Sequence, residues 1–261
     1  MGIRDSNEYG QTAASDNPLP NAALEQQHAA FQAHYLHALN AAVEEGSIIK
    51  ARQSGEARHR GAQETLNRLL KKHPQWQNRR IDLYIHRNLP PSPHRPFDHW
   101  PIDFCASATL PELIEMGERL LDSASENSDV LTALLAHEAG HTINGDNTPQ
   151  SQASYHATPK SHLREILANR MGAILFGNPK AYGEAFLTIS ECQESATHPS
   201  TAQMRNHFAN WAKILESQGA LNSNGDIIDT QKALDVFAAF KHTAALEATA
   251  ATQSLGRLDR T

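Results

Sequence analysis

Two histidines and a glutamate in the segment LLAHEAGHTINGD, residues 134–146, have the types and spacing of a metal-dependent hydrolytic site. His137 and His141 are four residues apart, so on a helix their rings project from one face and can reach a single metal ion. Glu138 lies one step round the helix, where a carboxylate can take a proton from an activated water and pass it to a leaving amine. Imidazole and carboxylate ligands favour zinc, and we expect one ion per chain.

A third ligand is needed, because the pattern H-E-x-x-H can arise from composition alone in a chain with 15 histidines. The metzincin continuation requires Gly at 144 and His at 147, and the chain has Asn144 and Asn147, so that branch is excluded. A glutamate on the following helix is the other common solution. Glu165 lies near the start of such a helix, after a loop long enough for the helix to turn back. The alternative for Glu165 is a surface carboxylate at a helix N-terminus.

Three segments in order resemble the signatures of the HtpX-like and CAAX-prenyl-protease family of gluzincin metallopeptidases. They are LLAHEAGH at 134–141, EILANRMGA at 165–173 and THPSTAQMRNHF at 197–208. The family patterns read approximately A-H-E-x-G-H, E-x-x-A-D and S-H-P-x-x-x-x-R, and the resemblance covers about residues 80–210. It implies a zincin-like fold and a zinc-dependent metalloendopeptidase.

The resemblance also implies a role for each matched residue. The zinc ligands and the general base would be His137, His141, Glu165 and Glu138. His198 matches a histidine that approaches the metal, either to stabilise the oxyanion or to cap the zinc in a resting form. Arg205 matches an arginine that buttresses the site. For His198 alone, the alternative is a turn residue before a helix.

Asn169 departs from the family pattern, which usually has Asp at this position to support a zinc-bound histidine. Asn can accept a hydrogen bond from an imidazole N–H but carries no charge, so ligand basicity and turnover would be lower. One alternative function is therefore a zinc-binding but weakly active or inactive scaffold of the same fold. Another is a helical interaction protein whose H-E-x-x-H is accidental.

A peptide or protein substrate would lie extended along an edge strand, held by backbone pairing. The resemblance assigns this strand to the segment Leu113, Ile114, Glu115, Met116 and Gly117. Such pairing tolerates many sequences, so the chain does not reveal the cleaved peptide.

These residues must be positioned by helices and strands, and the sequence pattern of those elements predicts the fold. It is a mostly helical α+β fold with a small antiparallel sheet beside the active-site helix. Helical periodicity within 21–73 predicts two helices, with Gly46 and Gly55 as interruptions. Alternation at 81–85 predicts a strand, and 102–110 and 111–117 are short extended candidates. Further helices are expected at 128–144, capped by Ser128 or Asp129 and ended by Gly145, and at 158–176, 180–193, 200–217 and 230–248.

These elements predict a polar disordered tail at 1–20 and one metallopeptidase domain at 21–261. Within the domain we expect a helical cover without chemistry at 21–79, a catalytic core at 80–217 and a C-terminal helical region at 218–261. The loop Pro90–Pro101 is rich in proline and could occlude the cleft. The remaining histidines, including His86 and His162, lack ligand spacing and are expected at the surface.

Composition excludes several other classes of protein. The net charge of −6 gives no electrostatic case for binding nucleic acid or anionic membrane, and the two cysteines suit a reducing compartment. No segment has the length of a transmembrane helix or the apolar core of a secretory signal. We therefore expect a soluble cytoplasmic protein, or one exported without a signal peptide. Gly2 and Ser6 match the myristoylation pattern, but the match constrains few positions and we favour a polar tail. The oligomeric state stays open.

Overall fold

The computed structural model describes residues 21–87, 106–146, 158–189 and 199–258. The predictions for the tail at 1–20, the loop Pro90–Pro101 and His198 lie outside the described residues. The helices are α1 (Asn21–Glu44), η1 (Ala51–Gln53), α2 (Ala57–Lys71), α3 (Glu118–Ser125), α4 (Ser128–Asn144), α6 (Thr158–Phe176), α7 (Pro179–Ile189), α8 (Thr201–Ser217) and α9 (Thr230–Leu258). The strands are β1 (Ile48–Lys50), β2 (Asp82–His86), β3 (Ala106–Leu110) and β4 (Leu113–Gly117).

The predicted α+β class, dominated by helices, is confirmed, but the prediction of a purely antiparallel sheet is wrong. The four strands are ordered β1-β2-β4-β3, and β2 pairs with β4 in parallel while the two outer pairs are antiparallel. The alternation of apolar residues predicts a strand and the face it buries, but it does not specify the neighbour or its direction.

The prediction that Leu113–Gly117 forms an edge strand is also wrong. Residues Leu113, Ile114, Glu115, Met116 and Gly117 do form β4, but this strand is paired with β2 on one side and with β3 on the other. All five residues are buried. The tight β3–β4 hairpin places β3 outside β4, so β1 and β3 are the outer strands among the residues that the structure describes.

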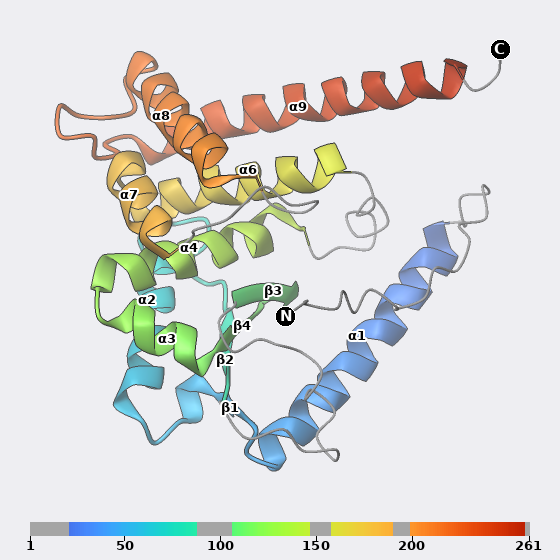
Figure 1. Cartoon of the computed structure of the whole chain (residues 1–261), viewed down its shortest axis with the longest axis vertical. Coiled ribbons are helices and arrows are strands. Elements are labelled where there is room, and N and C mark those ends of the chain that lie inside the picture. The colour runs from blue at the N-terminus through green and yellow to red at the C-terminus, as the bar shows by residue number, and fades with distance from the viewer. Residues whose placement is uncertain (1–20, 88–105, 147–157, 190–198, 259–261) are drawn as a thin grey trace, which may run out of the picture.

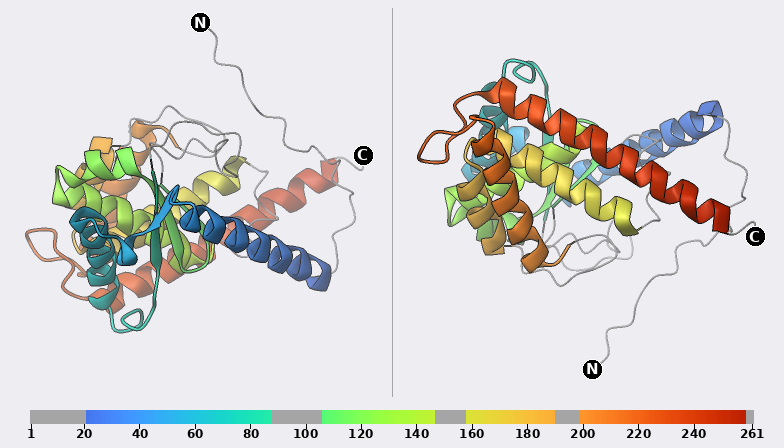
Figure 2. Two further views of the ribbon diagram at one scale, coloured as in Figure 1. Left: turned by 90° about the horizontal axis from the view of Figure 1, so that it is seen from below. Right: turned by 90° about the horizontal axis from the view of Figure 1, so that it is seen from above.

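The sheet lies between α1 on one face and α2 and α4 on the other (Figure 1). It separates two hydrophobic clusters. Successive side chains of a strand point to opposite faces, so Ile114 and Met116 of β4 enter the larger cluster beneath α2 and α4, while Leu113 faces α1. The larger cluster continues through α6, α7, α8 and the first half of α9. In both views of Figure 2, α1 and α9 extend from the body on the same side.

A polar group is buried between α1 and the sheet. The carboxylate of Glu115, which is fully buried on β4, accepts a hydrogen bond from the hydroxyl of Tyr35 on α1 and lies 2.7 Å from Nε2 of His86 on β2. The prediction that His86 lies at the surface is therefore wrong. The N-terminal region is correspondingly more than a helical cover, since β1 joins the sheet between the two helices predicted there.

The ends of α4 follow the local chemistry of the sequence. Asn127, rather than the predicted Ser128 or Asp129, caps the helix, and its side-chain oxygen accepts a hydrogen bond from the backbone N–H of Asp129 at 2.9 Å. Gly145 ends the helix with φ 75°, as predicted. None of the helices in the described ranges has both the length and the apolar composition needed to cross a membrane.

Candidate metal centre

The site is built where α4 and α6 pack closely together. A Cβ atom added to Gly140 would lie only 2.4 Å from the carbonyl oxygen of Ala168, so glycine at this position allows the backbones of the two helices to approach. Gly140 directly precedes His141, and Ala168 lies almost one turn after Glu165. The close approach therefore brings the carboxylate of α6 over the imidazoles of α4.

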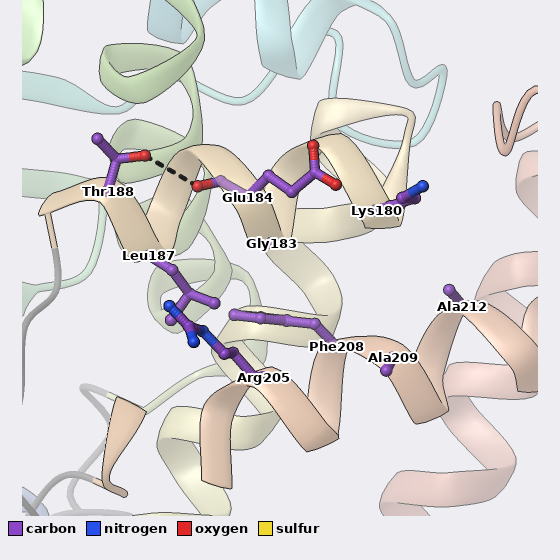
Figure 3. Close-up of a pocket in the computed structure, with 9 residues that line it drawn as sticks. All are labelled: Lys180, Gly183, Glu184, Leu187, Thr188, Arg205, Phe208, Ala209 and Ala212. Carbon is purple, nitrogen blue, oxygen red and sulfur yellow. Dashed lines mark hydrogen bonds between the residues drawn. The ribbon is translucent and has the colours of Figure 1, made fainter. Parts of the chain in front are cut away.

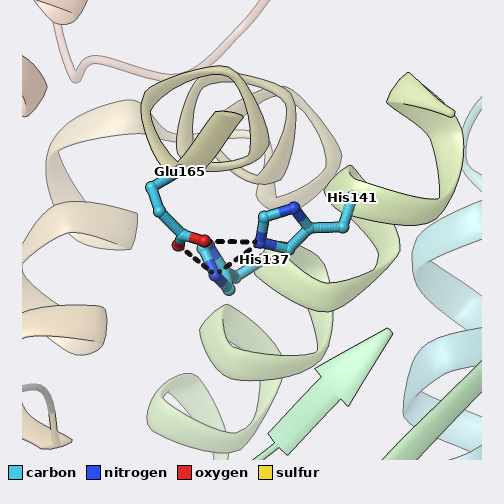
Figure 4. A group of neighbouring side chains, drawn as sticks. All are labelled: His137, His141 and Glu165. Carbon is cyan, nitrogen blue, oxygen red and sulfur yellow. Dashed lines mark hydrogen bonds and ion pairs between the residues drawn. The ribbon is translucent and has the colours of Figure 1, made fainter. Parts of the chain in front are cut away.

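The side chains of His137, His141 and Glu165 converge (Figure 4). The Nε2 atoms of the two histidines are 3.2 Å apart, and the two carboxylate oxygens of Glu165 lie 3.3 Å from Nε2 of His137 and 3.5 Å from Nε2 of His141. Tetrahedral zinc with bonds of about 2.0–2.1 Å requires donors separated by about 3.3–3.4 Å. The three donors thus have both the chemistry and the spacing that zinc needs.

Asn169 supports the first histidine, as its position one turn after Glu165 predicts. Its Oδ1 lies 3.1 Å from Nδ1 of His137 and accepts a hydrogen bond from the hydroxyl of Tyr182 at 2.8 Å. Its Nδ2 donates to the backbone carbonyl of Glu165 at 2.8 Å, which fixes the orientation of the amide. Because Oδ1 is an acceptor, His137 carries its proton on Nδ1, and the Nε2 lone pair faces the other donors.

Asp146 supports the second histidine in the same way. Its Oδ2 lies 2.7 Å from Nδ1 of His141, so this ring also presents Nε2 to the common point. The guanidinium of Arg164 on α6 lies 3.7 Å from the other carboxylate oxygen and also donates to the backbone carbonyl of Asp146. The turn after α4 is thereby tied to the helix that carries Glu165.

The electrostatics of the metal-free group reflect this convergence. Burial acts to lower the pKa of His141, but the charge of Glu165, hydrogen bonds to Asp146 and Glu165, and the charge of Glu138 outweigh it and hold the pKa well above its ordinary value. For Glu165, burial acts to raise the pKa, and the neighbouring imidazoles hold it well below the usual range. In the metal-free chain His141 thus balances the charge of Glu165, and a bound metal ion would displace the proton that this imidazole holds.

The surroundings of the three donors are apolar and aromatic. The ring of Phe186 on α7 lies 4.8 Å from that of His137, and Tyr182 stacks on Phe186 with centroids 5.8 Å apart. Burial, followed by the charges of Glu138 and Glu165, raises the pKa of Tyr182 well above its ordinary value, so its hydroxyl stays a proton donor. Glu138 itself is buried on α4.

Arg205 is exposed on α8 and lines a hollow of about 670 Å³ between α7 and α8, together with Leu187 and Phe208 (Figure 3). The rings of Phe208 and Phe186 are 6.1 Å apart, so an aromatic layer stands between this hollow and His137. The buttressing role of Arg205 stays a prediction. The role of His198 does too, because this residue lies outside the described residues.

Sequence reasoning missed three contributors to this site. Asp146 has a local signal, since it follows the Gly145 cap at a place where the chain reverses beside the last turn of α4. Tyr182 and Phe186 come from a helix whose sequence carries no motif, and only the packing of α7 on α4 brings them to His137. No protein-family model, curated protein or solved structure matches this chain, so the arrangement of its own side chains carries the interpretation.

Proposed function

We propose that this chain is a zinc-dependent metalloendopeptidase with a zincin-like catalytic domain. The observation that supports it most directly is the convergence of His137, His141 and Glu165. The two Nε2 atoms are 3.2 Å apart and each lies 3.3–3.5 Å from one carboxylate oxygen, separations that suit tetrahedral zinc. The order of the three sequence segments supports the same assignment. A three-ligand site leaves one coordination position for water or substrate, which distinguishes a catalytic zinc from a structural one.

In this proposal Glu138 is the general base. Bound zinc would supply a Lewis acid that polarises the scissile carbonyl and lowers the pKa of the attacking water. Glu138, buried beside the ligands, accepts the proton of that water and delivers it to the nitrogen of the leaving amine. Asn169 and Asp146 hold the two imidazoles in the required tautomer throughout. His198 would donate a hydrogen bond to the oxyanion.

The proposed substrate is a peptide in extended form. Since β4 is flanked on both sides, we place the peptide along β3, the outer strand that packs beside α4. Backbone pairing there would carry the scissile bond past the metal with little dependence on side-chain sequence.

The alternative is a zinc-binding scaffold of low activity. Asn169 favours it, because a neutral amide raises the basicity of His137 less than the carboxylate usual at this position. The charge that Asn169 lacks is present on Asp146, which supports the other histidine.

The test compares the wild type with Glu138→Gln on a fluorescently labelled casein, with zinc content measured in both proteins. We expect equal zinc and a loss of cleavage of about 10²–10⁴-fold, the range for removal of a general base. Glu126→Gln, at an exposed position before α4, is the matched control and should cleave like the wild type. Equal cleavage by Glu138→Gln would refute the base assignment, and zinc without cleavage in the wild type would favour the scaffold.

A further inference from the structure

A second group of side chains that could bind a metal comes from the start of α2 and from the junction of β4 and α3. Figure 1 shows these elements. Glu56 directly precedes α2, His59 lies in its first turn, and Glu118 opens α3 immediately after β4. None of these residues belongs to the peptidase site proposed above.

His59 is the unusual member of this group, because its side chain is fully buried. Its Nδ1 lies 2.8 Å from the hydroxyl of Ser54, but its Nε2 has no hydrogen-bond partner within the described part of the chain. That atom faces carboxylate oxygens of Glu56 at 3.6 Å and Glu118 at 3.7 Å, which are beyond hydrogen-bond distance. A buried ring nitrogen without a partner is costly, and here it is directed between two acids.

We propose that Glu56, His59 and Glu118 form a second metal site, which binds a divalent transition-metal ion such as zinc. The separations of 3.6 and 3.7 Å need to shorten by only a few tenths of an ångström to match the roughly 3.3–3.4 Å between donors on tetrahedral zinc. Ser54 is placed as the outer partner of the ring, the role that a polar group on the other nitrogen plays for most histidine ligands.

The protonation state of His59 suits this role. Burial lowers the pKa of His59, against the opposing effect of Glu56, so the imidazole is neutral at neutral pH and a metal need not displace a proton from it. The two carboxylates supply negative charge, so an ion of charge +2 would be compensated at the site.

Arg58 holds these carboxylates when the metal is absent. Its guanidinium nitrogens lie 2.9 Å from Oε2 of Glu56 and 2.7 Å from Oε1 of Glu118, the same oxygens that face His59. It also pairs with Asp122, one turn after Glu118 on α3. The side chains of Arg58 and Asp122 are 38% and 49% exposed, so Arg58 can keep Asp122 and release the two glutamates when a metal enters. Arg58 therefore competes with the metal.

The bound ion would be structural. It would tie the start of α2 to the corner between β4 and α3, and α3 packs directly on α4. An ion that binds only the folded chain stabilises it by mass action.

The test uses His141→Ala as background, so that the first cluster no longer binds tightly, and titrates this protein with zinc alone by calorimetry. We expect one equivalent to bind. Adding Arg58→Gln should tighten binding at least tenfold, because the competitor is removed. Adding Glu118→Gln should weaken it at least tenfold. Glu64→Gln, an exposed glutamate on the same helix, is the matched control and should change nothing.

Two results would overturn the proposal: no binding in the His141→Ala/Arg58→Gln protein, or equal weakening by Glu118→Gln and Glu64→Gln. Either would mean that Glu56, His59 and Glu118 do not form a metal site. Because His59 is fully buried, its replacement can impair folding, and the isosteric Glu118→Gln keeps the test interpretable. Glu165→Gln provides a second background if His141→Ala fails to fold. None of these outcomes bears on the peptidase, which is tested separately through Glu138.

Discussion

Among the described residues, two groups of histidine and carboxylate side chains have the arrangement to hold a metal ion, and they differ in what balances their charge. At the first, two imidazoles and the carboxylate of Glu165 converge with separations of 3.2–3.5 Å. At the second, one imidazole faces two carboxylates at 3.6–3.7 Å, and a guanidinium already binds both acids. Within the described residues, the imidazoles balance the carboxylate of Glu165 at the first group, whereas Arg58 balances both carboxylates of the second.

This difference has a physical consequence for affinity. At the first group, hydrogen bonds that the rings donate to Asn169 and Asp146 fix both imidazoles before any metal arrives, so little rearrangement of the side chains accompanies binding. At the second, the metal must displace Arg58, and only Ser54 orients the ring. We therefore expect the first group to fill before the second in a zinc titration.

The largest expected effect is the loss of tight zinc binding in His141→Ala. Removal of a direct ligand should cost more than the roughly 10–100-fold in affinity that follows loss of an outer hydrogen-bond partner. Casein cleavage should disappear with the metal. Zinc per chain, measured by elemental analysis after dialysis, checks the prediction. If His141→Ala keeps one tightly bound zinc ion, the second group binds zinc more tightly than the first, contrary to the expected order.

Two glycines on the helices that carry the groups should respond to alanine in opposite directions. Gly140→Ala would place a Cβ 2.4 Å from the backbone oxygen of Ala168, so α4 and α6 must separate, at a cost of about 1–3 kcal/mol. A Cβ atom added to Gly61 of α2 would meet open space, so Gly61→Ala should stabilise the chain by about 0.5–1 kcal/mol. Urea unfolding of both variants measures the contrast. A stable Gly140→Ala protein with unchanged zinc affinity would show that the close approach is unnecessary.

A smaller effect on zinc affinity is expected from Asn169, which supports His137 by a hydrogen bond and does not itself bind the metal. Asn169→Ala removes the acceptor of His137 and should weaken zinc binding about 10–100-fold. Asn169→Asp places a carboxylate there and should strengthen binding relative to the wild type, provided that the loss of the amide donor to Glu165 is tolerated. Competition with a chelator of known affinity measures the zinc affinity of both variants. An unchanged affinity in Asn169→Ala would show that the amide of Asn169 does not support zinc binding.

The smallest expected effect concerns the helix ends. Asn127 caps α4 through its side chain, and Asn127→Ala should destabilise the chain by about 1 kcal/mol. Glu56 occupies the corresponding position of α2, but its side chain makes no cap hydrogen bond, so Glu56→Ala removes no cap. Thermal unfolding of the two variants should therefore shift only for Asn127→Ala. A comparable shift in both would mean that Glu56 supports α2 in another way.

Much of the fold can be predicted from local patterns in the sequence. Periodicity and capping residues predict α4 and its end at Gly145, because these features depend on residues within a few positions of one another. The strand at 113–117 is likewise predictable, but its central position in the sheet is not. Pairing depends on residues far apart in the chain, and no pattern within β4 distinguishes an edge strand from an inner one whose two faces are both buried.

The two candidate metal sites also differ in whether local sequence patterns predict them. His137 and His141 are predictable because they have fixed helical spacing, and Glu165 because it lies near the start of the helix that follows. His59 is not, because its partners come from the residue before α2 and from the start of α3, 59 positions after His59 in the case of Glu118. Such a group forms only through tertiary packing, and no spacing rule anticipates it.

The buried carboxylate of Glu115 has a consequence for the chain before it is fully folded. It gives the sheet face beneath α1 a buried polar group, which Tyr35 and His86 accommodate in the folded chain. If α1 leaves this face during synthesis or heating, the uncovered surface is a wettable one rather than a continuous apolar patch. Inward-facing charges of this kind discourage sheets from joining one another, so transient exposure of this face should favour refolding over aggregation.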